Sequence, residues 1–120
     1  MSGFTRYALV AFGGALGSMA RYAAAMYAGA NWRTTMVVNV TGSFLIGLMA
    51  AAPIGGDPRL RLLLAAGFLG GYTTFSTWQL EALLSVRQGD MGGALANVGL
   101  SVLAGFAAVA IGYALGVRLR

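Results

Sequence analysis

The 120-residue sequence contains no cysteine, no histidine and no lysine. Without cysteine there is no disulfide framework, no thiolate metal site and no catalytic thiol. Without histidine, the usual transition-metal ligand and the usual general base are also missing. The side chains that remain supply enzymatic chemistry poorly, and we predict that the protein is not an enzyme.

Charge is scarce as well. Charged residues make up 9% of the chain and hydrophobic residues 58%, and the mean hydropathy is +0.76. Because soluble domains usually contain about 25% charged residues, we predict that much of this surface faces lipid. On a soluble protein, a net charge of +5 would indicate that the protein binds nucleic acid. Here the arginines stand mostly at segment ends, which is typical of membrane anchoring, and we expect no nucleic-acid partner.

The few charges divide the chain into four stretches of the length that crosses a bilayer, which is about 20 residues. We predict a single four-helix transmembrane domain over residues 1–120, with spans at about 5–29, 34–53, 62–86 and 91–117. The links are short, so an up-down bundle with both chain ends on one side follows. That side holds only a slight excess of arginine, which places the termini inside by a weak bias.

Glycine, in contrast, is abundant, at 19 residues. Pairs of small residues four apart let membrane helices approach closely. We predict close helix contacts at three such pairs: Gly13 and Gly17, Gly67 and Gly71, and Gly112 and Gly116.

Two of the predicted spans carry polar stripes. Thr35, Asn39 and Ser43 are four apart and share one helix face, and Asn97 and Ser101 repeat that spacing in the last span. Such groups often only hydrogen-bond between helices. Neutral amides and hydroxyls can also replace water around a small anion, so the two stripes together indicate a lined pathway.

The third span contains the stretch "GFLGGYTTFSTW", which has two interpretations. Its hydroxyl groups can bond back to carbonyls four residues earlier and bend a continuous helix. Alternatively, Gly70 and Gly71 loosen the helix until it breaks, and unwound backbone in a membrane is tolerated where protein buries it or an ion uses it. Exposed carbonyls at such a break would suit a small cation.

Aromatic and charged residues follow in the same region. Phe75 and Trp78 are three apart and point the same way, either into lipid or core or with their positive ring edges toward an anion. Glu81 continues that face, and we expect it at a vestibule or paired with an arginine. Arg21 either snorkels to the interface or attracts anions.

Three motifs in order, "GGALGSMARY", "VVNVTGSFLIG" and "GFLGGYTTFSTW", make the whole chain resemble the small fluoride channels called CrcB or Fluc. The resemblance implies an all-α membrane protein with four transmembrane helices and a break in the third, assembling as an antiparallel, dual-topology homodimer. It also implies a multi-pass channel of the cytoplasmic membrane. That channel would let fluoride leave passively and so lower cytoplasmic fluoride and its toxicity.

The resemblance further implies individual roles. A structural sodium ion at the dimer centre would be held by the backbone carbonyls of Gly70 and Thr73. The positions that match the fluoride pore are Asn39, Phe75, Trp78, Asn97 and Ser101, with Ser43 on the same helix face as Asn39. The first-span arginine of the family corresponds to Arg21. Apart from the resemblance, we expect Arg21 and Glu81 to be the charged residues of a vestibule.

The chain departs from the family pattern at Trp78, where the usual "TTFSTF" has phenylalanine. An indole also offers a polarised ring edge and adds an N–H donor, but its larger ring would narrow a pore. A smaller departure is Gly105, where a hydroxyl often extends the polar track.

The sequence is also compatible with two other functions. A proton-coupled exporter of the small multidrug type also has four helices and is dimeric, but it needs a titratable carboxylate deep in the bundle. The only acidic residue inside a predicted span is Glu81, which lies late in its helix. A structural membrane subunit would explain the glycines but not the hydroxyl-rich third span.

Overall fold

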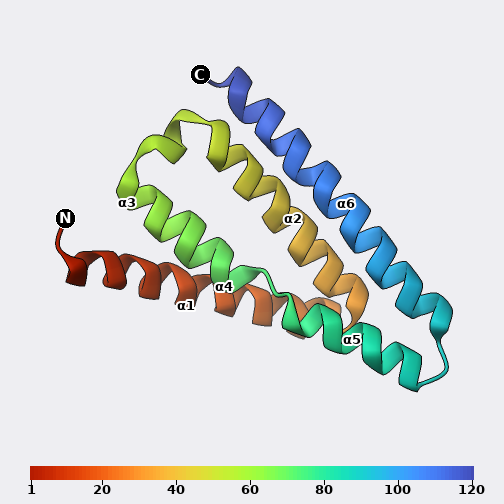
Figure 1. Ribbon diagram of the computed structural model, residues 1–120. Coiled ribbons are helices and arrows are strands. Elements are labelled where there is room, and N and C mark those ends of the chain that lie inside the picture. The colour runs from red at the N-terminus through yellow and green to blue at the C-terminus, as the bar shows by residue number, and fades with distance from the viewer.

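The computed structural model describes the whole chain, residues 1–120, and it is all-helical, as predicted. Four helical segments follow one another (Figure 1). The first is α1 (Gly3–Ala28), the second α2 (Trp32–Ala51) and the last α6 (Met91–Arg118). The third segment is composite, and its parts are η1 (Pro53–Gly56, a 3₁₀ turn), α3 (Pro58–Leu60), η2 (Arg61–Leu69, a π-helix), α4 (Gly70–Tyr72) and α5 (Ser76–Arg87).

Short polar side chains determine where the helices begin. Asn31 caps α2 by accepting hydrogen bonds from the backbone N–H groups of Arg33 and Thr34, at 3.0 and 3.2 Å. Asp90 caps α6 in the same way, through a 2.7 Å bond from the Gly93 N–H. Gly29, which follows α1, has a φ of 93°, a conformation that favours glycine and ends the helix.

The helices pack as two close pairs, α2 with α6 and α1 with the run from η2 to α4. A Cβ added at Gly112 would lie 3.0 Å from the backbone nitrogen of Leu48, and one added at Gly17 would lie 2.9 Å from that of Tyr72. Gly13, Gly67, Gly71 and Gly116 likewise face backbone or side-chain atoms of the neighbouring helix. The three glycine pairs therefore make the close contacts that the sequence predicts.

Helical structure stops at Tyr72 and resumes at Ser76. Between them the backbone of Thr73 is extended, with φ −82° and ψ 157°. The Thr73 hydroxyl bonds back to the Leu69 carbonyl at 2.8 Å, and the Thr74 hydroxyl accepts the Thr77 N–H at 3.2 Å. The hydroxyl groups thus satisfy backbone groups on both sides of the interruption.

The π-helix η2 leads directly into this interruption. Its last turn is closed by a bond from the Gly70 N–H to the Ala65 carbonyl, five residues earlier. π-helical turns are rare in proteins, and those that occur are often found at functional sites.

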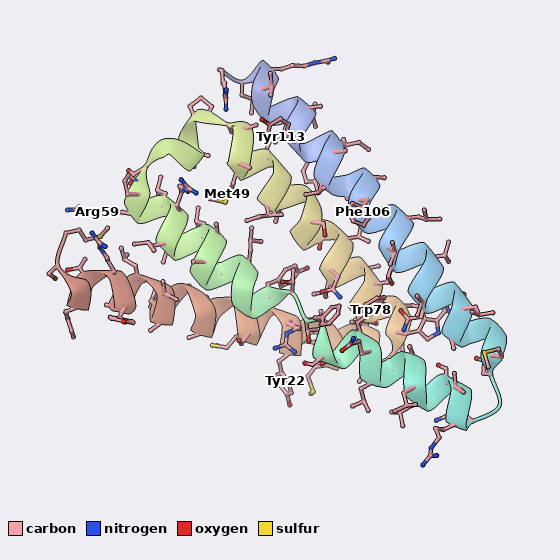
Figure 2. All side chains as sticks on the ribbon, in the orientation of Figure 1. Tyr22, Met49, Arg59, Trp78, Phe106 and Tyr113 are labelled. Carbon is pink, nitrogen blue, oxygen red and sulfur yellow. The ribbon has the colours of Figure 1, made fainter.

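Few residues are buried within one chain, only 14 of 120. Large apolar side chains stand exposed along the molecule, among them Phe4, Leu103 and Phe106 (Figure 2 labels Phe106). Two helices, Trp32–Ala51 and Met91–Arg118, are long and apolar enough to cross a membrane. A chain that exposes this much apolar surface needs lipid or a partner to cover it.

Candidate functional site: a polar pathway beside the helix interruption

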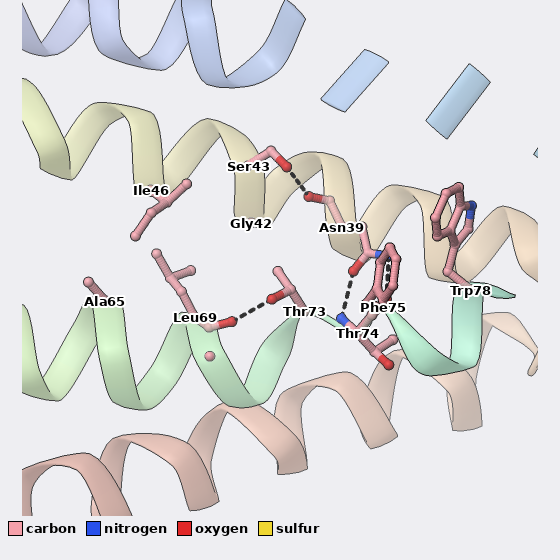
Figure 3. A pocket seen from close by; sticks show the side chains of 11 residues that line it. Asn39, Gly42, Ser43, Ile46, Ala65, Leu69, Thr73, Thr74, Phe75 and Trp78 are labelled. Carbon is pink, nitrogen blue, oxygen red and sulfur yellow. Dashed lines mark hydrogen bonds between the residues drawn. The ribbon is translucent and has the colours of Figure 1, made fainter. Parts of the chain in front are cut away.

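Asn39 on α2 holds the interruption in place. Its side-chain amide donates to the Thr74 carbonyl at 2.9 Å, and its amide oxygen accepts the Thr74 N–H at 2.8 Å (Figure 3). Both bonds to unwound backbone come from one side chain, so Asn39 takes the place of the helical partners that Thr74 lacks. The second N–H of the amide remains free for another acceptor.

A cavity of about 410 Å³ lies between α2 and the interrupted segment (Figure 3), and we call it the central cavity. Asn39 and Ser43 line it from α2, and Ser43 bonds to the Asn39 carbonyl at 2.8 Å. The rest of the lining consists of Gly42, Ile46, Ala65, Leu69, Gly70, Thr73, Thr74, Phe75 and Trp78.

Gly70 and Thr73 both line the central cavity, and the carbonyls of both accept no hydrogen bond. The N–H that would normally bond to the Gly70 carbonyl is that of Thr74, which instead bonds to Asn39. Free carbonyl oxygens beside a cavity are suitable ligands for a hard cation such as sodium.

The rings of Phe75 and Trp78 lie together, with centroids 5.5 Å apart and planes tilted by 44°. They separate the central cavity from a second one of about 350 Å³, which we call the ring cavity. Four residues line both cavities: Asn39, Ser43, Phe75 and Trp78. The two cavities therefore meet at two polar side chains of α2 and two aromatic rings.

The polar residues of α6 take different places. Ser101 lines the ring cavity, as Gly105 does, whereas Asn97 is fully buried and lines neither cavity. Asn97 accepts a bond from the Ser101 hydroxyl at 3.2 Å and donates to the Trp78 carbonyl at 3.4 Å. The indole N–H in turn donates to the Asn97 carbonyl at 3.5 Å. Asn97 thus lies buried outside the cavities and holds Trp78 and Ser101, two residues of the cavity lining, by hydrogen bonds.

Arg21 and Glu81 line a third cavity, of about 270 Å³, on the other side of Thr74. They form no ion pair, so of the two roles expected for Glu81, at a vestibule or paired with an arginine, the structure does not show the pairing. Glu81 instead accepts a 2.9 Å bond from the Thr35 hydroxyl, and its other carboxylate oxygen is buried without a partner. Arg21 donates to the Gly71 carbonyl at 3.2 Å, next to the interruption.

Ser18 is a functional candidate that the sequence motifs did not indicate. Ser18 also lines this third cavity, three residues before Arg21 and therefore on the same helix face. Thr77, four residues before Glu81, lines it from α5. The sequence signal for both residues was a hydroxyl three or four positions before a charged residue, which places the two side chains on one helix face.

Comparisons with known proteins identify the family of the chain. Residues 8–113 match the family model described as "CrcB-like protein, Camphor Resistance (CrcB)". A relative from Solibacter usitatus, named fluoride-specific ion channel FluC, is 46% identical over 94% of this chain and 99% of its own length. A FluC from Thermus thermophilus is 43% identical over 98% of each chain, and FluC 1 from Listeria innocua is 39% identical over 92% of this chain and 97% of its own.

Proposed function

The chain belongs to the CrcB family, and on that premise we propose that it is a fluoride-specific ion channel through which fluoride leaves the cell passively. A channel makes and breaks no covalent bond, so the protein is not an enzyme. Hydrogen fluoride crosses the membrane and dissociates inside, and the anion then needs a pore to escape. Passive export would lower cytoplasmic fluoride and its toxicity.

The observation that carries this proposal is the boundary between the central cavity and the ring cavity. Asn39 and Ser43 offer an amide and a hydroxyl there, and Phe75 and Trp78 contribute aromatic rings, whose edges would face the anion. Neutral donors and positive ring edges stabilise a small anion without binding it irreversibly. Ser101 continues the polar lining into the ring cavity.

We further propose that the chain spans the cytoplasmic membrane four times, with the third span formed by the run from α3 to α5. The lengths of α1, α2 and α6 support this proposal, since a span needs about 20 residues. The interruption at residues 73–75 would then lie within the membrane, where Asn39 satisfies the freed backbone of Thr74.

An antiparallel homodimer is the proposed assembly. In a single chain the central and ring cavities are open, and Phe75 between them is 69% exposed. Phe106, which lines the ring cavity, is 74% exposed. A second copy over this face would enclose both cavities and cover the rings, which supports a dimer.

The resident cation would be a sodium ion at the dimer centre. The free carbonyls of Gly70 and Thr73 fit such a group, and two copies would supply four oxygen ligands. When bound, the ion would hold two interrupted segments together by charge. The protein's own contribution is to keep both carbonyls out of helical hydrogen bonds.

The alternative of a proton-coupled exporter is not favoured. The relatives that match nearly the full chain carry the name of a fluoride channel. Glu81 shares its cavity with Arg21 and bonds to Thr35 and does not line the central cavity.

The experiment that tests the proposal is fluoride efflux from liposomes that contain the purified protein. Chloride-loaded liposomes serve as the selectivity control, and protein-free liposomes report leakage. Fluoride efflux without chloride efflux is expected. Absence of fluoride efflux would contradict the proposal and leave a packed membrane subunit without a working pore.

A further inference from the structure

A cavity that adjoins the central cavity at Ala65 opens between the start of α1 and the start of η2, with a volume of about 430 Å³. We call it the basic cavity, because Arg6 and Arg61 line it and no acidic side chain does. Its remaining wall is largely apolar and includes Leu62, Ala65 and Ala66. Neither arginine lines the central, ring or Arg21–Glu81 cavities.

The guanidinium groups of Arg6 and Arg61 have no protein partner. They form no hydrogen bond, whereas Arg21 and Arg120 each donate to a backbone carbonyl, at 3.2 and 2.6 Å. The acidic residue nearest to Arg61 in the chain is Asp57, which accepts from the Arg59 N–H at 2.8 Å and so caps α3. Each guanidinium therefore keeps five donors in a planar fork that matches phosphate.

The position of these arginines favours the phosphate of a lipid headgroup over a free phosphate ion. Both stand near the first turn of a helical segment, α1 and η2, at the end of the molecule that holds the two termini (Figure 1). In a membrane-spanning bundle, the ends of the segments lie at headgroup depth. Leu62, Ala65 and Ala66 follow Arg61 along η2, so in a membrane they would lie on the acyl-chain side of it. A free phosphate ion would leave this apolar wall uncovered, whereas a phospholipid would cover it.

We propose that the basic cavity binds an anionic phospholipid. The lipid phosphate lies between Arg6 and Arg61, and one acyl chain follows the wall of Leu62, Ala65 and Ala66. Juxtamembrane arginines attract anionic lipids, and two unpaired guanidinium groups beside an apolar slot turn that general attraction into a site. The proposal depends on the membrane location of the chain and not on fluoride conduction.

The test is native mass spectrometry of the detergent-purified full-length protein titrated with phosphatidylglycerol. The variant is Arg6→Gln with Arg61→Gln, and the matched control is Arg59→Gln with Arg118→Gln. The control removes two charges from the same end of the molecule, from arginines that do not line the basic cavity. We expect the cavity variant to bind phosphatidylglycerol at least about tenfold more weakly, since each charge-assisted contact contributes about that factor. The control is expected to bind like wild type.

A second variant tests the apolar wall without touching a charge. Ala66 is exposed and lines only the basic cavity among the cavities described, so Ala66→Phe fills the slot without disturbing the core. We expect it, too, to weaken phosphatidylglycerol binding. Fluoride efflux and the elution volume of each variant show whether it is folded.

Three outcomes would overturn the proposal. Equal loss of binding in the Arg59/Arg118 control would mean diffuse charge attraction and no site. Equal binding of phosphatidylcholine, which has the same phosphate but a cationic headgroup, would exclude selection of an anionic lipid. Displacement of phosphatidylglycerol by inorganic phosphate, with Ala66→Phe binding normally, would identify a free-anion site.

Discussion

Replacing Asn39 with alanine tests whether this side chain holds the interrupted segment in place. The wild-type amide makes two bonds to Thr74, one from the Asn39 amide nitrogen at 2.9 Å and one to its oxygen at 2.8 Å. Alanine removes both at once. The N–H and carbonyl of Thr74 then have no partner in the protein, because the backbone there is not helical.

The magnitude follows from the two bonds. A typical net contribution is about 1 kcal/mol per bond, and about 0.6 kcal/mol is the average for interhelical bonds in membranes. Two bonds therefore stabilise the closed arrangement by about 1.2 to 2 kcal/mol. Since about 1.4 kcal/mol is a factor of ten, the opening equilibrium at Thr74 should rise by about 8- to 30-fold in Asn39→Ala.

The assay is hydrogen exchange of the Thr74 amide in the micelle-embedded protein, followed by NMR. Thr41→Val is the matched control, because Thr41 also lies on α2 and its hydroxyl bonds to Val37 and Tyr72, but not to Thr74. Asn39→Asp separates two roles. A carboxylate oxygen can still accept the Thr74 N–H but cannot donate to the Thr74 carbonyl, so part of the protection should remain, while a negative charge in the pathway should slow fluoride efflux.

Unchanged exchange of Thr74 in Asn39→Ala would refute the reasoning, because the amide would then be protected by something other than Asn39. The same acceleration in Thr41→Val would refute it as well, since the effect would then report general loosening of α2.

Three further predictions concern packing, mechanism and the pore. Gly112→Ala should lower the free energy of unfolding by about 1 to 3 kcal/mol, because the added methyl group overpacks against Phe44 and Leu48. Thermal unfolding measures this loss, and the control is Gly99→Ala, where a Cβ meets nothing within 4 Å. An equal loss in the control would contradict the packing argument. Glu81→Gln should leave fluoride efflux unchanged with or without a pH gradient, because glutamine still accepts the Thr35 hydroxyl bond; loss of a proton-driven component would support an exporter. Trp78→Phe should conduct fluoride at least as fast as wild type in liposome efflux, because the smaller ring widens the path. Little is lost with the indole, since its 3.5 Å bond to the Asn97 carbonyl is at the outer limit of a hydrogen bond. Abolished efflux would show that the indole is required.

The helical class, the approximate ends of the helices and the close helix contacts were predictable from the sequence. These features depend on local signals: uncharged stretches, caps such as Asn31 and Asp90, and glycines four residues apart. A glycine pair needs no partner residue of a particular kind, because any helix backbone can approach it. The family was recognisable for a related reason, since its motifs are short and contiguous.

Only the tertiary structure decided which partner each polar side chain bonds to and which cavity it lines. Asn39 meets Thr74 across 35 residues of sequence, and Arg21 meets Gly71 across 50. The helical spacing of Asn97 and Ser101 predicted one shared stripe, but only Ser101 reaches a cavity, because Asn97 is fully buried and its amide bonds to the Trp78 carbonyl. Glu81, likewise, lies in one cavity with Arg21 and yet bonds to Thr35.

The physical reason is the same in each case. Periodicity states which face of a helix a side chain occupies, but not which neighbour it meets there. In a polar pathway every donor has several acceptors within reach, and its partner depends on the crossing of helices and on where the third segment unwinds. The sequence by itself therefore determined that a polar, interrupted segment exists in an apolar helical protein. The packing of α2, α5 and α6 around Thr74 decided which of its polar groups support the backbone and which face the cavities.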